Sequence, residues 1–302
     1  ARELANLGNA YSDGALSNRN LIINGAMQVA QRGTGAAGVN STGYYTLDRF
    51  RVRHDTSSTS TLEKVSDAPD GFGSSFKLTT TTAGSIGANQ SLRIDHMIES
   101  SDLQRLKFGT SNAETFTVSF WVKSSIAGNY SFNVYQYVGG NQVNDTYTIN
   151  SANTWEHKSI TFIGNTVNAN ADDNSRGFEL GWFMASGSNM GTTSQLTTWT
   201  AYSAANYGAG QDVDISGTLN ATFYLTGVQL EVGDTATPFE HRSYGDELAR
   251  CQRYFWSLNS GGSSYKYLAQ GANYTNAQCY SHIPFPTDMR AVPSLAVSSQ
   301  TD

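Results

Sequence analysis

Alternation of apolar and polar residues is the main pattern along the chain from Leu21 onward. In residues 45–54 (YTLDRFRVRH), Phe50 and Val52 share one face of an extended strand, and the neighbouring arginines share the other. Turns rich in glycine, serine and asparagine separate the strands, and Gly227 indicates a β-bulge in the last one. The same period of two predicts further strands over residues 116–124, 130–138, 155–163, 178–184 and 222–232.

These strands predict an all-β fold. Segments 116–124 and 130–138, joined by the turn IAGN, are expected to form an antiparallel pair. Residues 94–108 are the exception, because their apolar positions suit a short helix or an irregular connection. About eight to ten short strands without a long amphipathic helix favour an antiparallel β-sandwich with jelly-roll topology over residues 21–240.

The two ends of the chain differ from this pattern. Residues 1–20 predict a stem or linker, with a brief helix over 1–7, because so short a piece cannot bury a core. After residue 240, DELARCQRYFW has helical spacing, with Leu248 and Cys251 on one side. Residues 241–302 are interpreted as the start of an incomplete C-terminal module in a longer chain, with strands expected over 261–270, 277–285 and 289–300.

Composition narrows the class of protein. Hydrophobic residues make up 38% of the chain and charged residues 15%, while 29 glycines and 16 tyrosines fit a β-rich fold with many turns. The aromatic share of 12% argues against disorder. The net charge is −6 and no run of lysine and arginine occurs, so nucleic acid is not an expected partner. No run of about 18 apolar residues predicts membrane insertion.

Motifs for catalysis or metal binding are absent or weak. The chain contains no HExxH, GxSxG or CxxC, and RGTGAAG lacks the helix that a dinucleotide-binding loop requires. Cys251 and Cys279 fit two free buried thiols or one disulfide. Asp172, Asp173 and Asn174 could hold a structural calcium ion, or could simply solvate a polar loop. We therefore expect no catalytic residues, no enzymatic activity and no cofactor beyond such a calcium ion.

Aromatic residues outside the predicted core are candidates for a binding site. Sugars place an apolar ring face on aromatic side chains while polar groups bind their hydroxyls, and a strand face or loop can supply both. The alternative is that a second sheet, a loop or a neighbouring subunit covers these residues. The glycan-binding candidates are Trp121, Tyr135, Tyr137, Trp199, Tyr202 and Tyr207.

Arginines provide candidates for an interface. Arg49, Arg51 and Arg53 form an outward basic stripe that could meet an anionic polysaccharide or pair with acids of a neighbouring subunit. Arg242 and Arg250 lie in the stretch that leaves the last sandwich strand, where Pro238 fixes a non-helical exit. Their charges are expected to fix an interdomain angle or a subunit contact rather than to catalyse a reaction.

Four longer stretches resemble a known group of proteins. NLIINGAMQVAQRGT, YTLDRFRV, FTVSFWVKSSIAGNYSF and TFYLTGVQLEVGDTATPFEHRSYGDELARCQRYF are similar to β-sandwich domains in tail-fibre and other virion structural proteins of tailed bacteriophages. The resemblance covers roughly residues 15–256. It implies a jelly-roll domain similar to carbohydrate-binding modules, carried on a virion appendage as a homotrimer beside other tail proteins.

The resemblance and the aromatic residues lead to one main hypothesis and two rivals. The main hypothesis is a tail-fibre protein, assembled in the host cytoplasm into the virion, that recognises host surface polysaccharide. The first rival is a purely architectural fibre shaft, baseplate or capsid decoration. The second is a polysaccharide depolymerase, which the lack of β-helix repeats and of a marked carboxylate pair disfavours.

Overall fold

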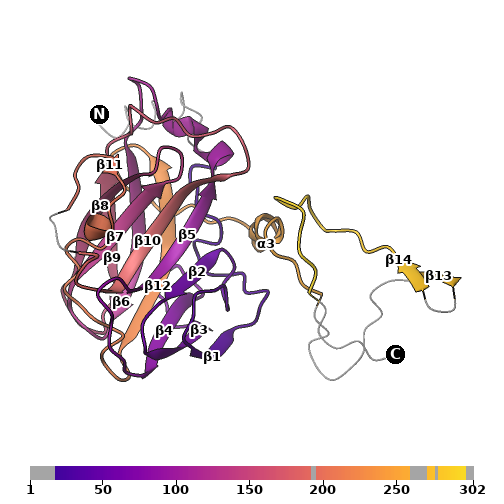
Figure 1. The fold of residues 1–302 in the computed structure, drawn as a ribbon, viewed down its shortest axis with the longest axis horizontal. Coiled ribbons are helices and arrows are strands. Elements are labelled where there is room, and N and C mark those ends of the chain that lie inside the picture. The colour runs from indigo at the N-terminus through magenta and orange to yellow at the C-terminus, as the bar shows by residue number, and fades with distance from the viewer. Residues whose placement is uncertain (1–17, 192–194, 259–270, 276–277, 297–302) are drawn as a thin grey trace.

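The structure is a computed structural model that describes residues 18–191, 195–258, 271–275 and 278–296. The helix predicted over residues 1–7 and the strand predicted over 261–270 lie outside these residues. Two six-stranded antiparallel sheets stack face to face (Figure 1). Sheet A contains, in spatial order, β1 (Gly35–Val39), β3 (Thr59–Val65), β4 (Ser75–Thr82), β12 (Thr222–Val232), β6 (Phe116–Ser124) and β9 (Glu156–Phe162). Sheet B contains β11 (Thr200–Ala201), β8 (Asn141–Ile149), β7 (Gly128–Gln136), β10 (Arg176–Ser186), β5 (Ser91–Glu99) and β2 (Phe50–His54).

The order of the strands defines a jelly roll. Strand β4 pairs with β12, β5 with β10, β6 with β9, and β7 with β8. This nesting of early strands on late ones, with successive strands mostly alternating between the sheets, is the jelly-roll topology. The predicted fold class is therefore confirmed. The predicted bulge is confirmed as well, because the register of β12 against β6 shifts between Thr226 and Gln229 around Gly227, whose φ is +61°.

Large apolar side chains from both sheets meet in one core. Trp182 of β10 is fully buried, and its ring lies 4.9 Å from Phe132 and 5.8 Å from Phe120. Phe120 belongs to sheet A and Phe132 to sheet B, and their ring centroids are 6.1 Å apart. Burial of each such side chain stabilises the fold by roughly 1.5–3 kcal/mol.

The predicted pairing of residues 116–124 with 130–138 is wrong. These segments are β6 and β7, and they belong to different sheets. Their connection, Ser125–Ala127, crosses from one sheet to the other instead of forming a hairpin. Both strands direct their Phe and Val residues into the same core from opposite sides, so their alternation resembles that of a hairpin.

The expected helix or irregular connection over residues 94–108 is only partly correct. Residues Ser91–Glu99 form β5, which lies between β10 and β2, and a 3₁₀ helix, η1 (Ser100–Leu106), follows it. His96 takes an inward position in β5, where its ring lies 4.9 Å from Phe50, and Met97 takes an outward one. This exchange of polar and apolar positions hides the strand in the sequence.

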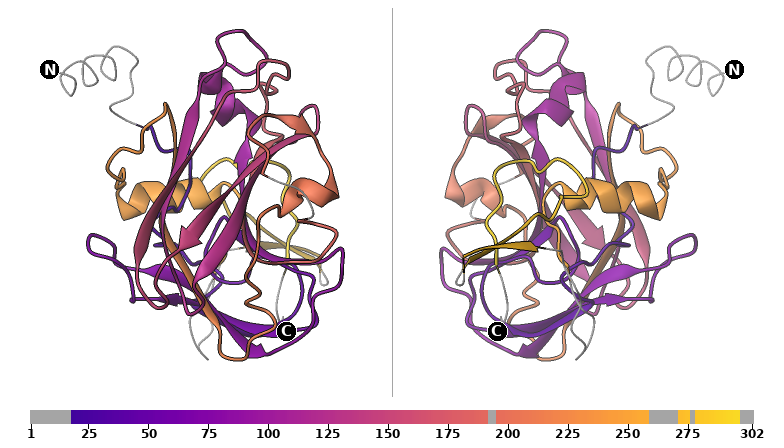
Figure 2. Two further views of the ribbon diagram at one scale, coloured as in Figure 1. Left: turned by 90° about the vertical axis from the view of Figure 1, so that its left-hand side faces the viewer. Right: turned by 90° about the vertical axis from the view of Figure 1, so that its right-hand side faces the viewer.

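Helices and a hairpin complete the described chain. Helix α2 (Ala204–Tyr207) is a single turn. Ser243 caps the N-terminus of α3 (Tyr244–Gln252), because its hydroxyl accepts a hydrogen bond from the amide of Asp246. Strands β13 (Gly271–Thr275) and β14 (Gln278–Ser281) form a hairpin away from the sandwich (Figure 1), and in the two end-on views of Figure 2 this hairpin overlaps the sandwich. Residues 289–296 contain no strand, contrary to the prediction. No described helix has the length and apolar character needed to cross a bilayer.

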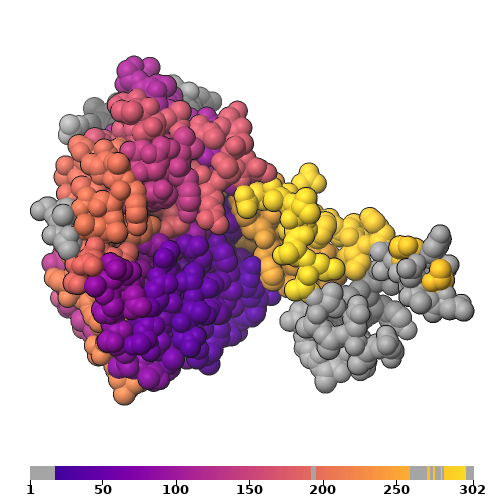
Figure 3. Space-filling model, in the orientation of Figure 1, coloured from indigo at the N-terminus to yellow at the C-terminus, as the bar shows by residue number. Residues whose placement is uncertain are grey.

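Helix α3 packs beside the sandwich with its predicted apolar side. Cys251 is a free and fully buried cysteine that contacts Ile23 and Val29, and Leu248 and Tyr254 border the same small cluster. Burial raises the pKa of the Cys251 thiol far above its ordinary value. In the space-filling view the C-terminal segment adjoins one side of the sandwich and then extends away from it (Figure 3).

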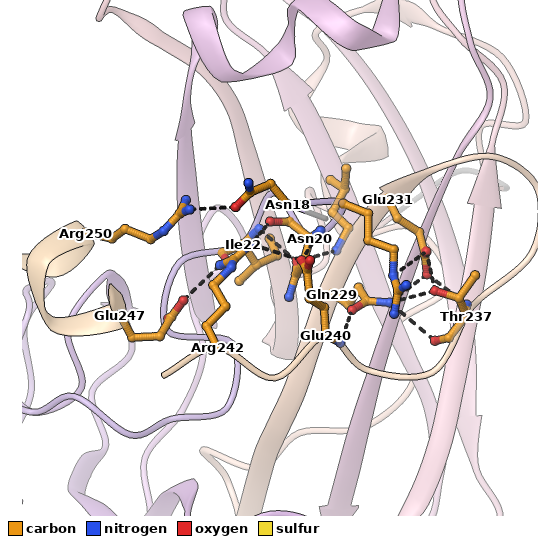
Figure 4. A network of polar contacts seen from close by, with 12 residues as sticks. Asn18, Asn20, Ile22, Gln229, Glu231, Thr237, Glu240, Arg242, Glu247 and Arg250 are labelled. Atoms are coloured by element: carbon orange, nitrogen blue, oxygen red, sulfur yellow. Dashed lines mark hydrogen bonds and ion pairs between the residues drawn. The ribbon is translucent and has the colours of Figure 1, made fainter. Parts of the chain in front are cut away.

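A polar network joins the N-terminal segment, β12 and α3 (Figure 4). Arg242 donates to the carbonyl oxygens of Ile22 (2.9 Å) and Asn20, and it forms a 2.9 Å ion pair with Glu247. The side-chain oxygen of Asn20 accepts from the amide of Leu230 at 3.2 Å. These contacts hold the beginning of the described chain, the last sandwich strand and the helix together.

Both interface candidates in this region have partners within the chain. The side chain of Arg242 is only 9% exposed, so its contacts are internal. Arg250 donates to the side-chain oxygen of Asn18 at 2.9 Å from an exposed position. A subunit contact at Arg250 and the domain boundary at residue 240 stay predictions.

Candidate functional site

A buried glutamate organises the outer face of sheet B. Glu179 lies on β10 between the inward-facing residues Phe178 and Leu180, so its side chain faces away from the core. One carboxylate oxygen accepts from the hydroxyl of Tyr207 and from Arg93, both at 2.8 Å. The other accepts from the hydroxyl of Tyr137 at 2.8 Å and from Arg51 at 3.3 Å.

A second acid completes a network of compensated charges. Asp95 of β5 forms ion pairs with Arg51 at 2.6 Å and with Arg93 at 2.7 Å. Arg93 is 1% exposed and Asp95 is fully buried. Two arginines therefore balance Asp95 and Glu179, as buried charges require.

The electrostatics keep Glu179 ionised, whereas burial raises the pKa of Asp95. Burial acts to raise the pKa of Glu179, but the charge of Arg93 and the hydroxyl donors Tyr207 and Tyr137 hold it below the ordinary value. Burial, together with the charge of Glu179, raises the pKa of Tyr137. The carboxylate therefore stays an acceptor and the tyrosine hydroxyls stay donors at neutral pH.

Four tyrosines form a continuous row beside Glu179. Ring centroids are 5.0 Å apart for Tyr137 and Tyr135, 5.6 Å for Tyr135 and Tyr202, and 5.4 Å for Tyr202 and Tyr207. Every pair packs edge to face, the arrangement that aromatic rings favour. Tyr202 is 49% exposed, whereas Tyr207 is buried, so the row presents a fixed aromatic surface to solvent. The structure thus brings together Tyr135, Tyr137, Tyr202 and Tyr207, four of the predicted glycan-binding residues.

A covering loop (residues 187–215, of which 192–194 lie outside the described part) places two of these tyrosines. It contains β11 and α2 and lies over β8 and β7. Gln142 of β8 donates to the carbonyl of Ser203 at 3.0 Å, and the amide of Ser131 in β7 donates to the side chain of Gln211 at 2.7 Å. These bonds fix the loop on the sheet and hold Tyr202 and Tyr207 against the strand-borne tyrosines.

Trp199 lies in the loop before β11, as predicted, but apart from the tyrosine row. Its ring packs against Phe108 at 5.5 Å and Phe178 at 5.9 Å, and its indole N–H donates to the carbonyl of Ile163 at 2.7 Å. The side chain is partly buried against the main core. Trp199 therefore has a packing role at the end of the sandwich, and a glycan contact of this residue stays a prediction.

Trp121 lies far from the tyrosine row in the fold, on the outer face of sheet A. Its ring is 5.2 Å from His157 of the neighbouring strand. A Cβ on Gly227 would lie 2.9 Å from Trp121 and 2.7 Å from Phe72, so the glycine allows these two aromatic side chains to approach β12. A ligand at Trp121 would form a separate site, which stays a prediction.

The arginine stripe pairs within the chain. Arg51 contacts Asp95 and Glu179 as described, Arg53 forms a 2.7 Å ion pair with Asp55, and Arg49 donates to the carbonyl of Met97. The structure contains one chain, so a contact of the stripe with a polysaccharide or a neighbouring subunit stays a prediction.

The calcium candidates lie in the exposed loop before β10. Asp173 accepts from the amide of Ser175 at 2.9 Å, and Asn174 donates its side-chain amide to the carbonyl of Arg290. Asp172 is also exposed. Within the described ranges, no group of three or more histidine, cysteine, aspartate or glutamate side chains is arranged to hold a metal ion. A calcium ion at these residues stays a prediction.

Sequence reasoning did not identify the ionic centre of the site. Arg93 and Asp95 lie in the unrecognised strand β5, and Glu179 lies in the predicted strand 178–184, where nothing marked it as a site residue. A signal was present, because Arg93 and Asp95 alternate with the apolar residues Leu92 and Ile94. Charged residues at such positions are buried only when they are paired.

These features define a jelly-roll β-sandwich with one outer face on which buried ion pairs fix a row of tyrosines. No family model matches the chain, and no curated protein sequence matches it.

Several solved structures are distantly similar. The enzymatically active domain of tailspike protein 4 of bacteriophage CBA120 has 12% identity and a TM-score of 0.38 over 71% of this chain and 22% of its own. An arabinose-bound α-L-arabinofuranosidase, MgGH51, has 13% identity and a TM-score of 0.36 over 78% and 29%. The family 11 carbohydrate-binding module of a cellulosomal cellulase of Clostridium thermocellum has 11% identity and a TM-score of 0.34 over 71% and 96%. The chain thus spans less than a third of the first two, and its fold assignment rests on its own strand order.

Proposed function

We propose that the outer face of sheet B binds a glycan on the host cell surface and that the protein belongs to a phage tail fibre. The tyrosine row carries this proposal. Tyr202 offers a half-exposed ring for the apolar face of a sugar, and the rings of Tyr135 and Tyr137 continue that surface. Arg176 lies beside Tyr137 and adds an exposed hydrogen-bond donor for sugar hydroxyls.

The rigidity of the row is what makes it suitable for binding. Glu179 anchors the hydroxyls of Tyr137 and Tyr207, and the covering loop holds Tyr202 against both neighbours. Side chains that are already ordered lose little conformational entropy when a ligand binds. We propose a binding role without catalysis, because both oxygens of Glu179 are occupied by donors from the chain itself.

The tail-fibre part of the proposal is supported by the sequence resemblance and by an exposed apolar arm. Large apolar residues of the C-terminal segment remain in solvent in the single chain: Leu258, Ile283, Phe285, Val292 and Leu295. Exposed apolar residues gathered in one segment are typical of a contact surface. We propose that a homotrimer covers this arm, so that several weak glycan sites act together and raise the effective affinity. The molar mass of the chain in solution, measured by light scattering, tests the assembly.

Binding to an array of bacterial capsular polysaccharides and O-antigens tests the glycan proposal. We expect Tyr202→Ala to lower the affinity for the bound glycan about tenfold, equivalent to about 1.4 kcal/mol, without a change in thermal stability. Tyr244→Ala is the matched control, because Tyr244 is 56% exposed at the start of α3, away from the row. Absence of any bound glycan, or equal affinity of both variants and the original chain, would support the architectural role instead.

A further inference from the structure

A cavity of about 200 Å³ lies next to the tyrosine row, and its charge is unbalanced. It lies between the strands of sheet B near Arg49, Met97 and Arg176 and the C-terminal segment near Tyr254 and Arg290. Among the described residues, four arginines and two acids line it: Arg32, Arg49, Arg176, Arg290, Asp48 and Glu99. We call this cavity the arginine cleft.

The two acids of the arginine cleft already have arginine partners. Asp48 pairs with Arg32 at 2.8 Å. Glu99 receives two hydrogen bonds of 2.9 Å from Arg253. The other three arginines of the cleft, Arg49, Arg176 and Arg290, form no ion pair with an acid of the described residues, although Asp48 and Glu99 lie near enough for the charge of Arg49 to act on the pKa of both.

Arg49 is the buried one of these three arginines. It is 7% exposed, and it forms no ion pair with an acid of the described residues. It donates to the carbonyl of Met97, its guanidinium lies 3.4 Å from the ring centroid of Tyr254, and its Nε atom is buried without a hydrogen-bond partner. A buried cation without a carboxylate partner is costly, and an anion in the cleft would remove that cost.

Two further arginines point to the same ligand chemistry. Arg176 is exposed, and its side chain donates to the hydroxyl of Tyr137 at 3.3 Å; Arg290 donates to the carbonyl of Asn174 at 2.8 Å. Neither forms an ion pair with a described acid. Guanidinium groups bind carboxylates and phosphates alike through paired hydrogen bonds, so the arginines indicate an oxyanion as the ligand group.

The walls and the position of the arginine cleft indicate that a sugar carries this anionic group. The aromatic side chains of Tyr44 and Tyr254 line the cavity, and its volume suits roughly one sugar ring, below the range for drug-sized ligands. Met97 of the cleft lies directly opposite Glu179 in the sheet register, and Arg176 contacts Tyr137. The cleft is therefore continuous with the tyrosine row.

Resting on the proposed glycan binding, we infer that the arginine cleft binds the carboxylate of an acidic sugar, such as a uronic acid, within the host polysaccharide. The neighbouring neutral sugars of the same polysaccharide then lie along the tyrosine row.

Calorimetry with the full chain and a matched pair of ligands tests this inference. One ligand is an oligosaccharide that contains glucuronic acid, and the other is the same oligosaccharide after reduction of its carboxyl group. We expect at least tenfold tighter binding of the acidic form, and we expect this preference to decrease with added salt. Arg49→Gln should abolish the preference and leave binding of the reduced form unchanged, and Arg176→Gln should reduce it several-fold. Lys77→Gln, which removes the same charge from sheet A, should leave the preference intact.

Each outcome separates the inference from the proposed function. Equal binding of both oligosaccharides overturns the acidic-sugar site and leaves glycan binding by the tyrosine row standing. Binding of free glucuronate that is lost in Arg49→Gln and kept in Tyr202→Ala supports the cleft even if the row fails. Equally tight binding of inorganic phosphate and glucuronate overturns the sugar assignment. If Arg49→Gln does not fold, calorimetry of the original chain and of Arg176→Gln with the acidic and the reduced oligosaccharide tests the acidic-sugar site instead.

Discussion

Replacement of Glu179 by glutamine tests whether the ionic network holds the site together. The substitution keeps the shape of the side chain but removes the charge that faces Arg51 and Arg93. One oxygen remains to accept two of the four donors, while the new amide group meets the other two, including either Tyr137 or Tyr207. Breaking a buried ion pair costs about 3–5 kcal/mol, and the partial retention of acceptors places the expected loss of unfolding free energy near ~3 kcal/mol.

Urea denaturation with and without the substitution measures this loss, and pH provides a second readout. The pKa of Glu179 is lower in the folded protein than in the unfolded chain, where it is about 4.3. Its contribution is therefore complete above the unfolded pKa and is lost as pH falls through the folded pKa. The stability difference between the original chain and Glu179→Gln should stay constant from about pH 7 to 5 and shrink below about pH 4.

A matched control isolates the effect of burial. Glu63 pairs with Lys77 at 3.3 Å, and its side chain is 38% exposed, so Glu63→Gln should cost less than about 1 kcal/mol. A loss for Glu179→Gln as small as that for Glu63→Gln would refute the view that the network supports the fold. A stability difference that does not change with pH would show that the charge of Glu179 is not responsible.

Two further predictions concern the packing and the assembly of the chain. Gly25→Ala should destabilise the fold by about 1–3 kcal/mol in urea denaturation, because the added Cβ would lie 2.1 Å from the carbonyl oxygen of Val228. Gly35→Ala is the control and should have little effect, because the space around Gly35 is open. An equal loss of unfolding free energy in both variants would contradict the clash. Val292→Asp should lower the molar mass measured by light scattering if the exposed C-terminal segment lies in the trimer interface. The control Val167→Asp, at a similarly exposed valine, should leave the mass unchanged. An unchanged mass for both variants would exclude Val292 from that interface.

The strands could be predicted where small polar residues mark the outward positions. In β6, Thr117 and Ser119 are almost fully buried, yet their polarity still alternates with the core residues Val118 and Phe120. In β5, His96 inside and Met97 outside reverse the pattern, so the strand was missed. The sequence signal thus depends on residue type and fails where a buried polar residue is satisfied by its surroundings.

The pairing of strands and the full site depend on contacts between distant segments. The period of two correctly placed Tyr135 and Tyr137 away from the core. It could not show that the covering loop brings Tyr202 and Tyr207 beside them, because that position rests on bonds between the loop and β8 or β7. The same holds for Glu179, whose partners come from β2, β5, the turn directly after β7 and the covering loop.

The buried charges on the outer face of sheet B give a reason to connect the ionic network with glycan binding. Apolar side chains of similar volume often stabilise a buried position as well as an ion pair does. Stability alone therefore does not explain why Arg51, Arg93, Asp95 and Glu179 lie on the outer face of sheet B. What they add is fixed geometry, since Glu179 holds both ends of the tyrosine row, Tyr137 and Tyr207, through two hydroxyl hydrogen bonds of 2.8 Å. We therefore explain the ionic network by the glycan that the exposed tyrosine row is proposed to bind.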